Sequence, residues 1–185
     1  MLVDSHCHLN YKGLVEQQQD VLARARAAGV GTMLNISTRE CEWDDVIGLA
    51  EGEGDVWATV GIHPHEADAH PDVDTAKLVE RARHPRVIGI GETGLDYYYD
   101  HSDRARQRDS FVSHIAAARE TGLPLIVHTR DAEDDTAAML REGYPLVAIG
   151  DVEGSYLAIK ILGLEGLSGS QMPAREPIGR AHQRG

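Results

Sequence analysis

The sequence predicts an α/β fold in which strands and helices alternate. Short apolar runs bounded by glycine or proline recur along the chain, as buried parallel strands require. Between them lie stretches whose apolar residues repeat at helical spacing. Strand and helix alternate through five rounds before residue 145. This pattern fits either a closed (β/α) barrel or an open doubly wound sheet, and periodicity alone does not separate the two.

The first half of the chain supplies three strands and three helices. A strand is expected at residues 1–6, and a helix is expected at 11–30 because its apolar residues repeat at helical spacing. Gly29 closes this helix in the position that glycine usually takes beyond a helix C-terminus. The next elements are a strand at 31–37, a helix at 40–54, a strand at 55–65 and a helix at 74–84.

The second half continues the alternation and then departs from it. Its elements are a strand at 86–92, a helix at 104–122, a strand at 123–129 and a helix at 131–144. Acidic residues open the last helix, where they suit the positive end of its dipole. A sixth strand is expected at 145–152. Residues 1–150 therefore form one domain, and the mixture of glycine, serine, proline and arginine in 151–185 predicts an irregular tail.

The charge of the chain restricts its partners. The formal net charge is -12, and residues 151–185 hold four basic and four acidic side chains, so the negative charge lies in the first 150 residues. An acidic surface repels polyphosphate, so a nucleic acid would have to be engaged locally, through a metal or a few arginines.

The cysteines and the hydropathy indicate the compartment. Cys7 and Cys41 cannot build a disulfide framework, which fits a reducing environment. No apolar run approaches ~18 residues, and the N-terminus lacks the pattern of a signal peptide. The sequence therefore predicts a cytoplasmic protein without a membrane span.

Half of the histidines are predicted to lie at the ends of strands. His6 and His8 are two positions apart in a strand, so their side chains lie on the same face. They are about 7 Å apart along the strand and can converge on one metal. Each remaining member of the group also follows a strand, at the edge where α/β proteins bind ligands. The residues at strand ends are His6, His8, His63, His65, Glu92 and His128. The histidines expected to need no partner other than solvent are His70, His84, His101, His114 and His182.

The stretch "GIGETG" allows two interpretations. Gly89, Gly91 and Gly94 match the G-x-G-x-x-G spacing of a dinucleotide-binding loop. That loop needs a helix directly after the glycines and an acid at the end of the next strand, whereas here tyrosines follow and the next strand ends in His128. Glu92 would also repel a pyrophosphate. We therefore expect the glycines to shape the strand and a sharp turn after it, and Glu92 to bridge two cations with its two oxygens.

The segments "MLVDSHCHL", "GIHPHEA", "IGETGLDYY" and "LIVHTRDA" occur in this order along the chain. Together they resemble the TatD family of metal-dependent deoxyribonucleases within the amidohydrolase superfamily. The likeness runs from Met1 to about Gly143. It implies a (β/α) fold of the TIM-barrel type, incomplete here because the chain offers about five to six of the eight strands.

The resemblance also implies roles for single residues. The metal ligands would be His6, His8, Glu92 and His128, with Glu92 shared between two divalent cations. Glu92 and His63 are the expected catalytic residues, His63 through contact with the substrate. His65 and Arg130 would be further substrate contacts. The cations would be Mg, Mn or Zn, and a histidine-rich set suits Zn or Mn better on softness grounds. The substrate would be DNA or a small phosphodiester.

The end of the chain departs from the family pattern. Family members carry a later "HCF"-type histidine and a "TDSP"-type acid, which complete the ligands and supply the general base. The sixth-strand candidate "LVAIGDVEG" ends without histidine, and no "TDSP" follows. We interpret the change after about Gly143 as a truncated or frame-shifted gene. Another reading frame of the downstream DNA should then encode an "HCF" or "TDSP" segment, and a continuation with neither would exclude this interpretation.

Three functional hypotheses remain from the sequence. The first is a metal-dependent hydrolase of DNA phosphodiester bonds, and the second is an amidohydrolase acting on a C–N or ester bond. The third is an inactive or weakened remnant that binds metal. Five or six strands cannot close a barrel that needs eight, so each hypothesis also predicts self-association through the open barrel edge.

Overall fold

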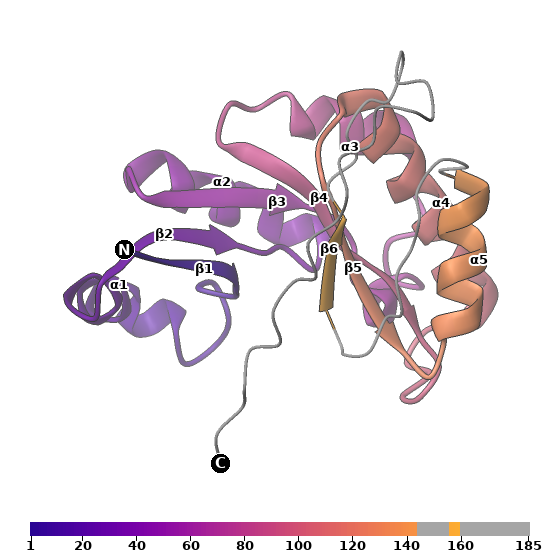
Figure 1. The fold of residues 1–185 in the computed structure, drawn as a ribbon, viewed down its shortest axis with the longest axis horizontal. Helices are drawn as coiled ribbons and strands as arrows, with labels where there is room; N and C mark the ends of the chain where they lie inside the picture. Colours follow the sequence, from indigo (N-terminus) through magenta and orange to yellow (C-terminus); the bar gives the residue numbers. More distant parts are fainter. Residues whose placement is uncertain (144–155, 160–185) are drawn as a thin grey trace, which may run out of the picture.

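The computed structural model describes residues 1–143 and 156–159, which form one curled sheet with helices along it (Figure 1). The strands lie in the order β1-β2-β3-β4-β5-β6, so each one pairs with the next along the chain. The pairs from β1 to β5 are parallel, whereas β6 runs antiparallel to β5. The strand order does not reverse within the described sheet, as it would in a doubly wound fold. The predicted α/β fold is confirmed, and its arrangement is that of a barrel segment.

Strands and helices alternate as the sequence predicts. The strands are β1 (Leu2–Cys7), β2 (Val30–Asn35), β3 (Val56–Val60), β4 (Val87–Asp96), β5 (Leu125–Arg130) and β6 (Tyr156–Ile159). The α-helices are α1 (Gln18–Ala27), α2 (Trp43–Gly52), α3 (Thr75–Ala82), α4 (Arg104–Thr121) and α5 (Glu133–Gly143). The described residues also contain three short 3-10 helices, namely η1 (Val15–Gln17), η2 (Glu40–Glu42) and η3 (Pro64–Glu66).

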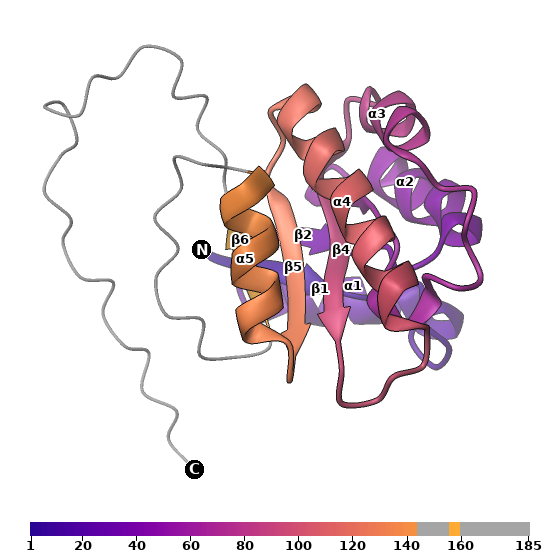
Figure 2. The same ribbon diagram turned by 90° about the vertical axis from the view of Figure 1, so that its right-hand side faces the viewer.

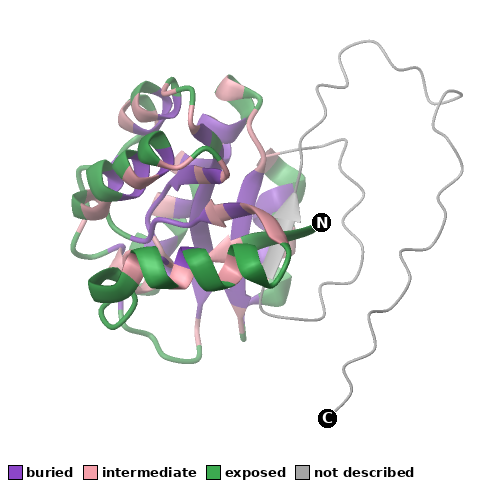
Figure 3. Cartoon of the chain, turned by 90° about the vertical axis from the view of Figure 1, so that its left-hand side faces the viewer, coloured by how far each residue is buried: buried purple, intermediate pink, exposed green. Residues whose placement is uncertain are grey.

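The helices pack on the strands through buried apolar side chains. Figure 2 shows α4 and α5 lying along β4 and β5. Each α-helix contributes at least one fully buried apolar residue, from α1 to α5 Leu22, Val46, Leu78, Phe111 and Leu140. Strands β3, β4 and β5 are mostly buried, whereas most of β1 and the outer faces of the helices are exposed (Figure 3). None of the helices in the described ranges is long and apolar enough to cross a membrane.

The first helix is shorter than predicted. Helix α1 begins at Gln18 rather than at residue 11, because the preceding residues form a turn and η1. Gly13 has φ 90° in this turn, and its amide donates to the Glu16 carboxylate at 2.6 Å. A residue with positive φ cannot continue a right-handed helix, so the apolar spacing here overstated the helix length. Gly29, also at φ 90°, follows the helix as predicted.

Strand β4 is longer than predicted. It runs to Asp96 rather than ending at Glu92, because its last residues keep pairing with β5, with Asp96 opposite Arg130. The predicted sharp turn at Gly94 is therefore wrong. Gly94 lies inside the strand at φ 135°, and a Cβ there would overlap the His128 carbonyl oxygen. Its absent side chain permits close approach of two strands rather than a change of direction.

The last predicted elements fall mostly outside the described residues. This holds for the sixth strand at 145–152 and for the tail at 151–185, apart from β6. Strand β6 lies within the segment expected to be irregular, where the sequence Tyr-Leu-Ala-Ile has the β propensity to pair with the edge of β5.

His114 corrects another expectation, because it is fully buried rather than solvated. Its Nε2 accepts the Ile62 amide at 2.9 Å, and its Nδ1 donates to the Ser110 carbonyl at 2.7 Å. It thereby ties α4 to the residue that precedes His63. Burial lowers the pKa of His114 from 6.5 to about 4.

We predict that His114 makes the protein acid-sensitive. The unfolded chain binds a proton at this residue below about pH 6.5, whereas the folded chain does so only below about 4, so stability is present above 6.5 and falls as the pH drops through this window. The loss amounts to about 3 kcal/mol. Urea unfolding at several pH values should show a flatter pH dependence for His114→Gln, which keeps a donor and an acceptor. His101→Gln, at an exposed position, should keep the wild-type dependence.

The edge at β1 is apolar and exposed. Among the described strands β1 pairs with β2 alone, and Met1, Leu2 and Val3 are 96%, 61% and 62% exposed. An open strand edge with apolar side chains favours pairing with another chain.

We therefore predict concentration-dependent self-association through this edge. Val3→Lys should weaken it, because a charged side chain on an edge strand opposes pairing with a second strand. Sedimentation velocity over a range of concentrations measures the effect. Val112→Lys, a change at an exposed apolar residue of α4, should leave association unaltered. Equal association of all three proteins would contradict the prediction.

Candidate metal centre

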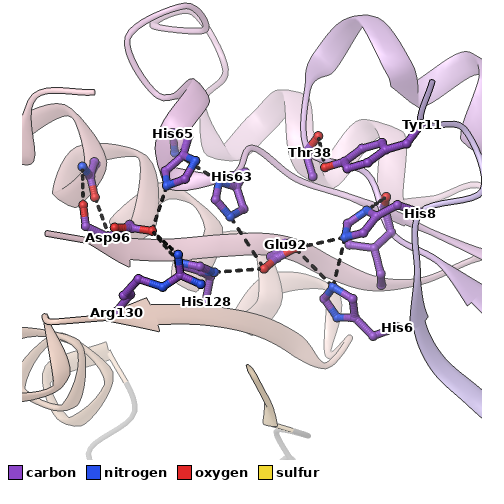
Figure 4. A network of polar contacts seen from close by, with 12 residues as sticks. His6, His8, Tyr11, Thr38, His63, His65, Glu92, Asp96, His128 and Arg130 are labelled. Carbon is purple, nitrogen blue, oxygen red and sulfur yellow. Dashed lines mark hydrogen bonds and ion pairs between the residues drawn. The ribbon is translucent and has the colours of Figure 1, made fainter. Parts of the chain in front are cut away.

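The parallel strands bring the predicted site residues together at the carboxyl-terminal end of the sheet, around Glu92 (Figure 4). His6 and His8 lie at the end of β1, His63 and His65 follow β3, Glu92 lies in β4, and His128 lies in β5. All six meet in space, although they are spread over more than a hundred residues of sequence. The extension of β4 places Glu92 within the strand instead of at its end.

Residues 36–38, which follow β2, hold three members of this group. Their backbone carbonyls accept hydrogen bonds from His8 Nδ1 at 3.0 Å, the Glu92 amide at 3.1 Å and the His63 amide at 2.9 Å. This segment carries no candidate ligand of its own, so sequence reasoning did not single it out. It nevertheless connects the ends of β1 and β3 with Glu92 in β4 and holds the three side chains close together.

The first group of ligand atoms has the spacing of a metal site. The Nε2 atoms of His6 and His8 lie 3.3 Å apart, and Glu92 Oε2 lies 3.3 Å from the first and 3.7 Å from the second. Two ligands about 2.1 Å from a tetrahedral cation are about 3.4 Å apart. Because His8 donates its Nδ1 proton to a carbonyl, its Nε2 carries the lone pair that a cation requires. These three residues fit a divalent cation.

The second group is centred on the other oxygen of Glu92. His128 Nδ1 lies 3.3 Å from Glu92 Oε1, and His128 Nε2 lies 3.0 Å from Asp96 Oδ2. A neutral histidine that donates Nε2–H to a carboxylate has its lone pair on Nδ1. A lone pair and a carboxylate oxygen at this distance repel one another unless a proton or a cation lies between them. This donor set also fits a cation, with Glu92 shared between both groups.

His63 differs from the other members in its tautomer. Its Nε2 lies 3.8 Å from Glu92 Oε1, close enough for a metal ligand. However, its Nδ1 accepts the His65 amide at 3.2 Å, so the neutral ring carries its proton on Nε2. Burial lowers the pKa of His63 from 6.5 to about 3, which keeps the ring neutral. In this arrangement His63 presents an N–H donor rather than a lone pair.

The charges of the centre suit cation binding. Burial alone would raise the pKa of Glu92, but its close contacts with the imidazoles of His128, His6 and His63 outweigh burial, so the pKa lies well below 4.5. Burial also lowers the pKa of His8. Metal ligands must be deprotonated to bind, and an ionised carboxylate beside neutral imidazoles meets that requirement. Cys7 takes no part, because its Sγ donates to the Leu34 carbonyl and burial raises its pKa to about 12.

Asp96 is a site residue that sequence reasoning missed. It is fully buried, and its Oδ2 accepts from His65 Nε2 at 2.8 Å and from His128 Nε2 at 3.0 Å. Burial would raise the pKa of Asp96, but hydrogen bonds from the Tyr99 amide and from His65 and His128 outweigh it and lower the pKa to about 2. The signal was present in the sequence, because positions 92, 94 and 96 share one face of a continuous strand.

A pocket opens above the ligand groups. Its volume is about 360 Å³. Its lining residues are His8, Tyr11, Thr38, Arg39, His63, His65, Glu66, Glu92, His128 and Arg130. The Tyr11 ring stacks on His8 with centroids 4.5 Å apart, and its hydroxyl donates to Thr38 Oγ1. Arg39 and Arg130 are the arginines of this lining, and they come from different strand ends. The pocket therefore combines the carboxylates of Glu92 and Glu66, imidazoles and two guanidinium groups, of which Arg39 is paired with Glu66 at 2.8 Å.

Comparison with known proteins gives the family of the chain. The model of the TatD related DNase family matches residues 3–150. The chain belongs to this family. The TatD membership inferred from the four sequence segments is thereby confirmed.

Relatives in the TatD family support this assignment. The "uncharacterized metal-dependent hydrolase YcfH" of Escherichia coli K12 is 41% identical over 144 residues, which are 76% of this chain and 54% of that protein. The "3'-5' ssDNA/RNA exonuclease TatD" of Cronobacter turicensis is 37% identical over 123 residues, which are 66% of this chain and 47% of that protein. The chain thus spans about half the length of these TatD relatives.

A solved TatD structure supports the fold. The crystal structure of YJJV, a TatD homolog from Escherichia coli K12, aligns with a TM-score of 0.72 and 30% identity, over 77% of this chain and 56% of that one. The predicted fold of the TIM-barrel type is confirmed by this likeness for the part of the chain that it covers. Five parallel strands of this TatD chain form a curled part of such a barrel.

Proposed function

We propose that this chain is a divalent-cation-dependent hydrolase that cleaves phosphodiester bonds of DNA. The observation that carries the proposal is the sharing of Glu92 between two ligand groups, one with His6 and His8 and the other with His128. A carboxylate shared in this way is the arrangement with which a protein holds two cations about 4 Å apart. Family membership and the nuclease name of one relative support DNA as the substrate class.

The bound cations would supply the hydrolytic chemistry, and the ligand residues would hold them in place. Divalent cations lower the pKa of a water molecule and neutralise charge on phosphoryl oxygens. Within the chain, His6, His8, Glu92 and His128 would hold them. The softness of three imidazoles favours Zn or Mn over Mg, without excluding Mg at cellular concentrations.

The residues around the ligands would bind and orient the substrate. His63, held with its proton on Nε2, would donate a hydrogen bond to a phosphoryl oxygen. Arg130 lines the pocket from the end of β5 and would neutralise part of the phosphate charge. His65 lines it as well and is held by Asp96. These contacts are local, as a chain with net charge -12 requires of a nucleic-acid enzyme.

A metal-binding remnant with little or no activity is the second candidate. The given sequence has no histidine at the end of "LVAIGDVEG" and no "TDSP" segment, the two features that carry a late ligand and the general base in the family pattern. The chain also spans 54% of a relative's length. Both candidates predict metal binding, and only the first predicts hydrolysis.

Nucleotide release from single-stranded DNA, with Mg, Mn or Zn added in turn, tests the proposal. We expect release that depends on the metal, is abolished by a chelator and is lost in Glu92→Ala. Equal background release by the wild type and Glu92→Ala would reject the hydrolase and favour the remnant. Amide and carboxylic-ester substrates belong in the same assay, since preferential cleavage of either would replace the nuclease by an amidohydrolase or esterase.

A further inference from the structure

The carboxylate of Asp96 is shared by two histidines and two backbone amides. Oδ2 accepts from His65 and His128, and Oδ1 accepts from the amides of Tyr98 at 3.1 Å and Tyr99 at 2.9 Å. The side chain is fully buried. An ionised carboxylate only accepts hydrogen bonds, so both histidines must offer N–H to it.

Asp96 is itself held firmly in place. Its amide donates to Gln107 Oε1 at 2.8 Å, and Gln107 Nε2 donates back to the Asp96 carbonyl at 3.2 Å. Gln107 belongs to α4, is fully buried and also donates to the Ser102 carbonyl at 2.9 Å. The end of β4 is thus locked to the helix behind it, and the carboxylate cannot turn away from its partners without breaking buried hydrogen bonds.

We propose that Asp96 is a positioning residue of the metal centre, which fixes His128 in the tautomer whose Nδ1 lone pair faces Glu92 Oε1. A neutral imidazole has one N–H, and the proton that Asp96 holds on Nε2 is therefore absent from Nδ1. Ring orientation and tautomer are set before any cation arrives. The inference rests on the proposed function in one respect, since it assumes that the Glu92 and His128 pair receives a cation.

Asp96→Asn separates this role from a merely structural one. Asparagine has the same shape, and its carbonyl oxygen can still accept from the Tyr98 and Tyr99 amides. Its amide nitrogen then stands opposite His128 Nε2 and donates to it. The proton of His128 must move to Nδ1, where it blocks the cation. If Asp96 only stabilised the fold, Asp96→Asn would alter stability without reversing the tautomer of His128.

The first measurement is the tautomer of His128, read from long-range ¹H–¹⁵N correlations of the metal-free protein at mildly alkaline pH. We expect the proton on Nε2 in the wild type and on Nδ1 in Asp96→Asn. A proton on Nδ1 in the wild type would overturn the proposal by itself, so the result does not depend on the folding of any variant. The same tautomer in both proteins would also overturn it.

The second measurement is Zn²⁺ binding by calorimetry. Asp96→Asn should weaken one binding event about 10- to 100-fold, the usual effect of losing a partner behind a metal ligand, and should leave the event at His6 and His8 unaltered. Asp44→Asn is the matched control, an identical change at a surface carboxylate of α2 that pairs with Arg81. Unaltered binding in Asp96→Asn would refute the proposal. Absent DNA hydrolysis, with the expected tautomer and Zn²⁺ binding, would refute only the proposed function.

Discussion

Glu92→Gln is expected to abolish cation binding at both ligand groups while leaving the chain folded. Glutamine has the shape of glutamate but no charge, and it presents one carbonyl oxygen where the carboxylate presents two oxygens. Oε2 faces His6 and His8, and Oε1 faces His128. Whichever way the amide is oriented, one group faces an NH₂ donor instead of a ligand. The other group keeps only a neutral oxygen, which binds a divalent cation weakly.

The expected loss of Zn²⁺ affinity is at least about 100-fold, because losing a partner behind a ligand already costs up to that much. Calorimetry of the chelator-treated protein measures it, and circular dichroism confirms that the fold persists. Glu51→Gln is a suitable control, since Glu51 also contacts a histidine, His84 at 3.0 Å, but lies on the surface. If Glu92→Gln bound as many Zn²⁺ ions as the wild type with similar affinity, Glu92 would not be the shared ligand.

Gly94→Ala should produce the largest loss of stability. Gly94 lies in β4 at φ 135°, a conformation that side chains rarely adopt, and its partner in β5 is His128. An added Cβ would overlap the His128 carbonyl oxygen and would lie 3.0 Å from the carbonyl carbon. Both are backbone atoms in a buried strand, so relief requires the strands to separate. We expect the free energy of unfolding to fall by about 3 kcal/mol or more.

Urea unfolding measures this change, with Gly48→Ala as the control. Gly48 lies inside α2 and has no atom within 4 Å of an added Cβ, so alanine there should stabilise the protein by up to about 1 kcal/mol. If the same glycine-to-alanine change lowers the free energy of unfolding at position 94 and raises it at position 48, steric overlap is distinguished from helix propensity. An unchanged unfolding midpoint for Gly94→Ala would mean that β4 and β5 are not as close as described. Separation of these strands should also weaken cation binding, since β5 carries His128.

Much of the fold follows from local sequence. Apolar runs bounded by glycine and proline predicted the five parallel strands, because a strand buried on both faces has no polar alternation. Helical spacing predicted the five α-helices found in the described part of the chain. The errors came where one residue changed the backbone. Gly13 turned the start of the first helix into a turn, and the glycines of β4 looked like a chain reversal although they sit within a strand.

The strand ends also predicted which residues would gather, because parallel strands carry their carboxyl ends to one edge. His6, His8, His63, Glu92 and His128 come within ligand distance of one another in two groups. The family itself was recognisable from four short segments. The residue types did not reveal whether each imidazole would offer a lone pair or an N–H donor, because a sequence does not show which ring nitrogen carries the proton.

By itself the sequence determined the alternation of strands and helices, the family and the set of residues at the sheet edge, because these depend on short-range patterns. Only the tertiary structure decided that Asp96 joins the centre, that His114 is buried and that His63 offers a proton where His8 and His128 offer lone pairs. The physical reason is that a histidine's tautomer is set by the partner of its other nitrogen. Those partners, the carbonyl of Ile36, the amide of His65 and the carboxylate of Asp96, are brought there by folding.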